Sequence, residues 1–281
     1  MQPSEIRLIV MDMDGTLLNS HQRISDENLQ ALRQADERGI ALAICSGRLC
    51  GDISLFAKAA GLNHCAMLSL NGAYCLDKPM GTAYANHAIA DVALQACVER
   101  LIRLDATFGG FAQNNLAIVA STREHDPVQW GSHAEGAFAP VYSYGVDALE
   151  RLRPQGVNKL VIVDTDHDRL RELRAELEQV SGVEVTSSWA NNLELMPLGV
   201  SKGTAVSELA NHLGLHAAQV MTFGDYDNDE SMIAYAGYGT AMANATECVK
   251  RAAKHHTLSN DENGVAVAIR RFALCAGHTR P

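Results

Sequence analysis

The hydrophobic residues near both ends of the chain occur in short runs that alternate with amphipathic segments. Three such runs cover residues 8–11, 40–45 and 220–224. Runs of this length are typical of buried strands in a parallel sheet. Between the first two runs, Ser25 is a suitable N-cap for an amphipathic helix over 25–38. Strands that alternate with helices in this way predict an α/β fold with a doubly wound parallel sheet.

The same patterns predict the remaining elements. Helices are expected over 50–60, 89–104, 167–180 and 202–213, and strands over 66–70, 116–121, 159–164, 183–188 and 192–196. The alternation is lost after about residue 84, and 122–145 is irregular, so an inserted α+β domain is expected over 85–190. The core would consist of residues 1–84 and 191–281, with its active site at the carboxyl ends of the parallel strands.

The composition limits the possible classes of function. The chain has 281 residues, with 33 acidic and 23 basic side chains and a formal net charge of -10. This balance is opposite to that of proteins that bind nucleic acids or anionic membrane surfaces, so neither partner is expected. No apolar run approaches the ~20 residues that cross a bilayer, and the first residues lack the features of a signal peptide. The seven cysteines form no CxxC pair, and we therefore expect a cytoplasmic protein.

The first candidate for chemistry is the acidic segment that follows the first predicted strand. Asp12 and Asp14 are two residues apart, and side chains repeat every two residues along a strand. The two carboxylates therefore face the same side for as long as the chain stays extended. Their mutual repulsion is relieved by a divalent cation such as Mg²⁺, which prefers oxygen ligands. A pair of turn-forming aspartates before Gly15 is the alternative interpretation.

A second acidic segment, GDYDND at 224–229, follows the predicted strand at 220–224. Three aspartates in five residues beside a glycine favour a cation-binding loop, although a solvated turn has the same composition. No glutamate follows at the spacing of an EF-hand calcium loop. The segment is therefore a second candidate for metal binding.

Two further positions are candidates for phosphate binding. Ser46 and Gly47 follow the strand at 40–45, where a hydroxyl group and a backbone N–H can contact phosphoryl oxygens. Lys202 stands at the start of the helix over 202–213, where its charge opposes the helix dipole unless it neutralises an anion. Taken singly, these are a common turn and a solvated lysine. Together with the two acidic segments at strand ends, they predict one phosphate- and metal-binding site.

These motifs resemble those of the haloacid dehalogenase-like (HAD) phosphohydrolases, in particular the Cof-type subgroup with a large C2 cap. The resemblance rests on DMDGT at 12–16, the serine of CSGR at 45–48, NGA at 71–73, LELMPLGVSKG at 193–203 and GDYDND at 224–229. It implies a Rossmann-like core and identifies residues 85–190 as a cap that determines substrate specificity. Tyr226 departs from the family pattern and Asp227 adds an acid, and both are expected to alter the rim of the site.

The resemblance implies a role for each acidic residue. Asp12 would be the nucleophile that forms an aspartyl-phosphate, and Asp14 would be the general acid and base. Mg²⁺ would be held by the carboxylates of Asp12 and Asp225 and by the backbone carbonyl of Asp14. Asp229 would support the metal site or the lysine.

By the same resemblance, the phosphoryl oxygens would be bound by the Met13 backbone, Ser46, the Gly47 N–H, Lys202 and Asn228. Arg48 and Asn71 would support the site, or would be ordinary loop residues. The implied function is a Mg²⁺-dependent phosphatase for a small phosphorylated metabolite, such as a sugar phosphate, a phosphorylated cofactor or a precursor of one. A sugar-phosphate phosphomutase and a non-catalytic phosphate-binding regulatory protein remain as alternatives, and the sequence specifies no oligomeric state.

Several other conspicuous residues are assigned to structure and not to chemistry. His255 and His256 are expected at a solvated helix end. Trp189 and the nine methionines are expected in core or interdomain packing. The irregular segment contains further candidates for substrate contact, which we interpret as surface-loop residues: His125, Trp130 and His133.

Overall fold

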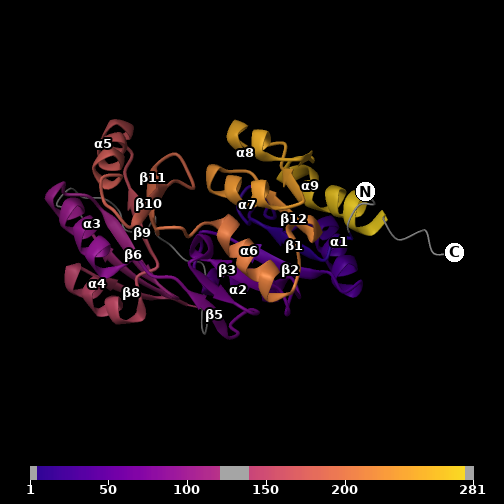
Figure 1. The fold of residues 1–281 in the computed structure, drawn as a ribbon, viewed down its shortest axis with the longest axis horizontal. Helices are drawn as coiled ribbons and strands as arrows, with labels where there is room; N and C mark the ends of the chain where they lie inside the picture. The colour runs from indigo at the N-terminus through magenta and orange to yellow at the C-terminus, as the bar shows by residue number, and fades with distance from the viewer. Residues whose placement is uncertain (1–4, 121–138, 276–281) are drawn as a thin grey trace.

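The computed structural model describes residues 5–120 and 139–275, which form two lobes lying side by side (Figure 1). The larger lobe is built on an eight-stranded sheet and the smaller lobe on a six-stranded sheet. We call them the large lobe and the small lobe. His125, Trp130 and His133 lie outside the described residues.

The sheet of the large lobe is parallel except at one edge. Its strand order is β14-β13-β12-β1-β2-β3-β4-β5. The strands are β1 (Leu8–Met11), β2 (Ala41–Cys45), β3 (Ala66–Ser69), β4 (Tyr74–Leu76), β5 (Ala83–Asn86), β12 (Val220–Gly224), β13 (Tyr238–Ala241) and β14 (His255–His256). Neighbouring strands are parallel from β14 to β3, and β4 and β5 add an antiparallel extension.

The side chains of β1 show why helices cover both faces of this sheet. Leu8 and Val10 pack with helices α6, α7 and α8, whereas Ile9 and Met11 pack with α1, α2 and α9. These helices are α1 (Asp26–Glu37), α2 (Cys50–Ala59), α6 (Lys202–His212), α7 (Glu230–Tyr235), α8 (Glu247–Ala252) and α9 (Gly264–Ala268). Because a strand that is apolar on both sides needs cover on both, the chain winds in two directions. The predicted doubly wound α/β sheet is confirmed.

The small lobe has one sheet with helices on one face. The strand order is β10-β11-β9-β6-β7-β8. The strands are β6 (Phe108–Ala112), β7 (Asn115–Val119), β8 (Val141–Tyr144), β9 (Lys159–Val163), β10 (Val183–Thr186) and β11 (Asn192–Pro197). Helices α3 (Asp91–Arg103), α4 (Val146–Leu152) and α5 (His167–Leu177) pack on this sheet through one hydrophobic cluster.

Short helical turns complete the described chain. The 3₁₀ turns cover Leu70–Gly72, Arg153–Gln155, Ala217–Gln219, Asp227–Asp229 and Asn260–Glu262, and a π-helical segment covers Ile269–Leu274. Within residues 5–120 and 139–275, no helix has the length and apolar character required to cross a membrane.

Some details of the sequence-based interpretation were wrong. His255 and His256 form the edge strand β14, which pairs with β13, and not a helix end. The segment 122–145 was predicted to be irregular, but strand β8 lies near its end. Met80 is 44% exposed and is not packed in the core. Trp189 is 43% exposed and is not a core residue either, but it lies between the two lobes, as the interdomain alternative expects.

The connection between the lobes bears on the predicted domain boundaries. Strand β11 pairs with β9 and β10, so the small-lobe sheet extends to residue 197, beyond the boundary expected at 190. Five residues later, at Lys202, α6 begins in the large lobe. The division into a core and an inserted domain with boundaries near 84 and 190 stays a prediction.

Candidate active site

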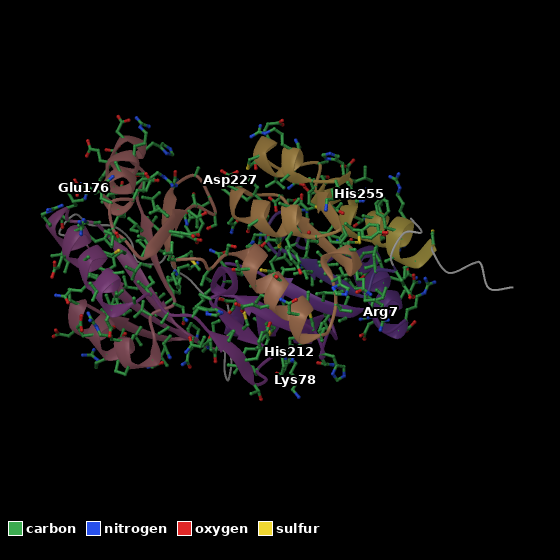
Figure 2. All side chains as sticks on the ribbon, viewed as in Figure 1. Arg7, Lys78, Glu176, His212, Asp227 and His255 are labelled. Atoms are coloured by element: carbon green, nitrogen blue, oxygen red, sulfur yellow. The ribbon has the colours of Figure 1, made fainter. Side chains whose placement is uncertain are left out.

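The parallel sheet brings distant parts of the chain together at one edge. Asp12 follows β1, Ser46 follows β2, and Asp225 follows β12, all at the carboxyl ends of adjacent parallel strands. Lys202 is the first residue of α6, which packs against the same sheet. In Figure 2, Asp227 marks the end of the large lobe nearest the small lobe, so this edge faces the small lobe.

Lys202 lies between two carboxylates in the interior of this edge. Its Nζ is 2.6 Å from Asp12 Oδ1 and 2.6 Å from Asp229 Oδ1, and all three side chains are buried. Helix α6 begins there because Ser201 caps it and exchanges hydrogen bonds with Thr204. Burial acts to lower the pKa of Lys202, but the two carboxylates outweigh it and hold the pKa well above its ordinary value.

Asp229 organises the second acidic segment. Its Oδ2 accepts hydrogen bonds from the backbone N–H groups of Asp225 (2.8 Å) and Tyr226 (3.0 Å). Two glycines allow this close packing. A Cβ at Gly224 would lie 2.4 Å from Asp229 Cβ, and a Cβ at Gly15 would lie 2.3 Å from Asp225 Oδ2. Gly15 also has a φ of +74°, a conformation that favours glycine.

Three carboxylates form a cluster that fits a divalent cation. Oxygen atoms of Asp12, Asp225 and Asp229 lie within 4.8 Å of one another. Burial and the charge of Asp229 raise the pKa of Asp225 to about 7, and the same two causes raise the pKa of Asp12 well above its ordinary value. Because Asp229 already uses both oxygens for Lys202 and the backbone, Asp12 and Asp225 are the better ligands. A hard cation that prefers oxygen would relieve the repulsion in this cluster.

Asp14 points to a different partner from that of Asp12. It lies beyond the end of β1, and its two oxygens accept hydrogen bonds from Arg48 Nε (2.7 Å) and Nη2 (2.6 Å). Arg48 also donates to Gln22 Oε1 (2.9 Å) and lies over the ring of Phe56. The side chain of Asp14 is 48% exposed, so it lies at the rim of the site while Asp12 lies inside.

Three of the predicted phosphate-binding residues, Ser46, Gly47 and Asn228, line the same cavity as Asp12. Ser46 is buried, and its Oγ accepts a hydrogen bond from the N–H of Arg48 (3.3 Å). Asn228 Nδ2 donates to Asn71 Oδ1 (3.2 Å), and the Asn71 N–H donates to the carbonyl of Ser46 (2.9 Å). Asn71 thus connects the turn after β3 with the second acidic segment.

A cavity of about 320 Å³ lies between the two lobes at this edge. It is lined by Asp12, Asp14, Ser46, Gly47, Arg48, Leu49, Asp52, Tyr226 and Asn228 of the large lobe and by Phe111, Lys159, Val161, Val163, Ser188, Trp189 and Glu194 of the small lobe. Lys202 and Asn71 line a second cavity of about 400 Å³ on the other side of Asn228. The volume of the first cavity is near the lower end of the range for small-molecule sites, roughly 300–1,000 Å³.

A buried ion pair in this cavity is absent from the residues predicted from the sequence. Lys159 Nζ lies 3.0 Å from Glu194 Oε1 and donates to the carbonyl of Gly47 (2.8 Å) in the large lobe. Glu194 also accepts hydrogen bonds from Asn71 and from Ser188 Oγ (2.8 Å). Burial acts to raise the pKa of Glu194, but Lys159 and these donors lower it overall. The sequence signal that could have indicated this pair is a charged residue in each of two mostly apolar strands, Lys159 in β9 and Glu194 in β11.

The chain is similar to known proteins over almost its whole length. A family model described as haloacid dehalogenase-like hydrolase matches residues 9–269. The 5-amino-6-(5-phospho-D-ribitylamino)uracil phosphatase YcsE of Bacillus subtilis is 31% identical over 271 residues, which cover 96% of this chain and 97% of that protein. The HMP-PP phosphatase of Cronobacter sakazakii is 31% identical over 241 residues. This alignment covers 85% of this chain and 85% of that protein.

Solved structures show the same fold. A haloacid dehalogenase-like hydrolase from Bacteroides thetaiotaomicron superimposes with a TM-score of 0.81 and 30% sequence identity. The alignment covers 95% of this chain and 99% of that one. A haloacid dehalogenase-like hydrolase from B. subtilis also has a TM-score of 0.81, at 26% sequence identity. That alignment covers 94% of this chain and 99% of the B. subtilis chain.

Proposed function

Because this chain belongs to the haloacid dehalogenase-like hydrolase family and is a phosphatase of that family, we propose that it is a Mg²⁺-dependent phosphate monoesterase that works through an aspartyl-phosphate. The observation that carries the proposal is the position of Asp12. Its carboxylate lies 2.6 Å from Lys202 and within 4.8 Å of the other cluster carboxylates, at the wall of the cavity.

Asp12 is placed to act as the nucleophile. In the first step its carboxylate oxygen forms a bond to phosphorus, and the bond between phosphorus and the ester oxygen breaks. Lys202 opposes the rise in the pKa of Asp12 that burial causes, and its positive charge reduces the repulsion between Asp12 and the phosphoryl dianion. A bound Mg²⁺, held by Asp12, Asp225 and the Asp14 carbonyl, would supply further positive charge at this point.

Asp14 is placed to handle the proton of the leaving group. It lines the cavity at the rim, where it would protonate the departing alcohol and then accept a proton from the water that hydrolyses the aspartyl-phosphate. In this structure Arg48 donates hydrogen bonds to both carboxylate oxygens of Asp14. At least one of these hydrogen bonds must break before Asp14 acts. Arg48 is thus proposed to hold Asp14 between turnovers.

The remaining predicted residues would hold the phosphoryl group. We assign this role to the Met13 backbone, the Ser46 hydroxyl, the Gly47 N–H, Lys202 and Asn228, with Asn71 and Asp229 as supports. The hydrogen bond between Asn71 and Asn228 and the two bonds from Asp229 to the backbone support this assignment.

The substrate is proposed to be a small phosphorylated metabolite. The related proteins are named for a phosphorylated ribitylaminouracil and for HMP-PP. The volume of the cavity supports a substrate of similar, small size. The net charge of -10 argues against nucleic acids and anionic membranes as partners and is compatible with a cytoplasmic enzyme.

The replacement Asp12→Asn tests the proposal. It removes the nucleophilic charge with little change in shape, so phosphate release from 4-nitrophenyl phosphate and acetyl phosphate should fall by at least about a thousandfold. The matched control is Asp26→Asn in the exposed first turn of α1, which should leave turnover unchanged. Circular dichroism checks that both variants are folded.

Two outcomes would contradict the proposal. Substantial activity of the folded Asp12→Asn protein would exclude this residue as the nucleophile. Conversion of a sugar phosphate into an isomer without release of phosphate would indicate a phosphomutase instead.

A further inference from the structure

The wall of the cavity formed by the small lobe is mostly apolar. Along β9, Lys159, Val161 and Val163 line the cavity, while the alternating Leu160 and Ile162 pack against the helices of the small lobe. Two-residue periodicity therefore gives β9 one face toward the site and one toward the core of the lobe.

Aromatic side chains extend this apolar wall. Phe111 lies opposite Lys159 on β6, and its ring centre is 5.3 Å from Lys159 Nζ. Trp189, in the loop between β10 and β11, lines the same cavity and is 43% exposed. The backbone of Trp189 is held by hydrogen bonds with Asn192 Oδ1 (3.1 Å) and Ser187 Oγ (2.7 Å). A large indole on a fixed loop beside a site offers a preformed surface to a flat ligand.

The charges around the cavity are unsuited to a second anionic group. Among the described residues that line it, the cationic side chains are Arg48 and Lys159, and each is bound to a carboxylate, Asp14 and Glu194 respectively. Lys202, behind Asp12, is bound to two carboxylates. The phosphoryl group of a substrate would use Lys202 and the metal, and Lys159 remains neutralised by Glu194.

From the apolar wall and these paired charges, we propose that the enzyme prefers monophosphates whose leaving group carries a flat, uncharged ring, which lies against Trp189, Phe111 and Val161. Leaving groups with a second phosphate or a carboxylate are disfavoured. This proposal rests on the phosphatase function proposed above and adds the chemical class of the leaving group to it.

A matched set of four esters tests the proposal. Benzyl phosphate and cyclohexylmethyl phosphate differ in the flatness of the ring, and both release a primary alcohol. 4-Carboxybenzyl phosphate and 4-carbamoylbenzyl phosphate differ in one negative charge at nearly constant shape. Acetyl phosphate, which has no ring, reports separately on phosphatase activity.

The flat ring and the neutral substituent should be favoured in kcat/KM. We expect benzyl phosphate to exceed cyclohexylmethyl phosphate by about 2- to 12-fold, the range for one favourable aromatic contact. The carbamoyl ester should exceed the carboxylate by at least about tenfold, because the cationic side chains that line the cavity are already paired with carboxylates and leave the added anion without a partner. Trp189→Ala should bring the benzyl-to-cyclohexylmethyl ratio close to one, and Trp189→Phe should restore it. Val92→Ala, at an exposed position of α3, is the control and should not change the ratio.

Binding can be followed without turnover. The chain has two tryptophans, so in an Asp12→Asn, Trp130→Phe background Trp189 is the single tryptophan and can be excited selectively. Benzyl phosphate should change its emission, and inorganic phosphate at saturation should change it less.

The outcomes separate the two proposals. Hydrolysis of acetyl phosphate with no preference for the flat ring, or with the carboxylate ester favoured, would overturn the leaving-group proposal and leave the phosphatase intact. Absence of hydrolysis for all four esters and for acetyl phosphate would instead contradict the phosphatase function itself.

Discussion

Asp12 and Asp14 are two residues apart in the sequence but have different partners in the structure. Asp12 is buried against Lys202, whereas Asp14 is half exposed against Arg48. The separation follows from the end of β1 at Met11, because the chain then turns and the N–H groups of Thr16 and Leu17 donate to the carbonyls of Met13 and Asp12. One motif thus provides a shielded carboxylate and one that solvent can reach.

Because of this difference, Asp14→Asn should affect esters according to their leaving group. The kcat/KM for benzyl phosphate, whose alkoxide needs a proton, should fall by about 10²- to 10⁴-fold. The kcat/KM for 4-nitrophenyl phosphate should fall much less, because its leaving oxygen is already stabilised. Steady-state assays of both esters at saturating Mg²⁺ provide the measurement, and equal losses would argue against a general-acid role.

Residues that directly follow strands could be predicted from the sequence. Asp12, Ser46 and Asp225 stand at strand ends, and parallel pairing brings such positions to one edge. Lys159 and Glu194 could not be found in this way. Their contacts with Gly47 and Asn71 depend on how the lobes are placed, which no local pattern specifies.

At the scale of elements, strands β9 and β11 carry the ion pair that joins the small lobe to the large one. Lys159 and Glu194 are on neighbouring antiparallel strands, and each also contacts a loop of the large lobe. Both side chains are buried, so neither charge is solvated if its partner is removed.

Single and double replacements of this pair should differ in stability. Lys159→Met alone leaves a buried carboxylate and should lower the free energy of unfolding by about 3–5 kcal/mol. The double variant Lys159→Met/Glu194→Leu removes both charges and should recover most of this loss. Urea unfolding of the two single variants and the double variant gives the coupling energy. A double variant as unstable as the sum of the singles would show that the charges do not act as a pair.

The predicted elements were found where the pattern was long or well capped. Ser25 accepts the expected hydrogen bond from the N–H of Asn28, and α1 follows it. Strand β6 was missed because its sequence, FGGFA, has two central glycines that hide the strand pattern. Helix α4 and strand β14, with seven and two residues, were too short to show a period.

At the scale of the whole molecule, the site is completed only where the lobes meet. The large lobe supplies the cluster of carboxylates and the small lobe supplies the apolar wall. Neither hydrophobic core of the large lobe contains a residue of the carboxylate cluster. Removal of a bound cation should therefore stop the chemistry and leave the fold in place.

Mg²⁺ binding should depend on pH through Asp225. Its pKa of about 7 exceeds the ordinary value of 3.8, so below pH 7 the cation must displace a proton. Affinity measured by calorimetry should rise by about tenfold per pH unit up to about 7 and then level off. In Asp225→Asn the affinity should be weaker and lack this slope, and a chelator should silence the wild-type enzyme until Mg²⁺ is restored.

The stability of the metal-free protein should have the opposite trend. The folded chain holds the Asp225 proton more tightly than the unfolded chain does, so this contribution is complete below about pH 4 and is lost as the pH rises through about 7. Thermal unfolding of chelated protein across this range checks the sign. A midpoint that rises with pH in the wild type but not in Asp225→Asn would contradict the raised pKa.

Both partners of the ion pair lie on the small lobe, and this has a consequence for chimaeras. A segment transplanted between relatives along the short connections before α3 and after β11 carries its own lysine and glutamate with it. The recipient then needs to supply only a backbone carbonyl, at Gly47, and one amide side chain, at Asn71. Such a graft brings a new wall for the leaving group without introducing an unmatched charge into the recipient's catalytic edge.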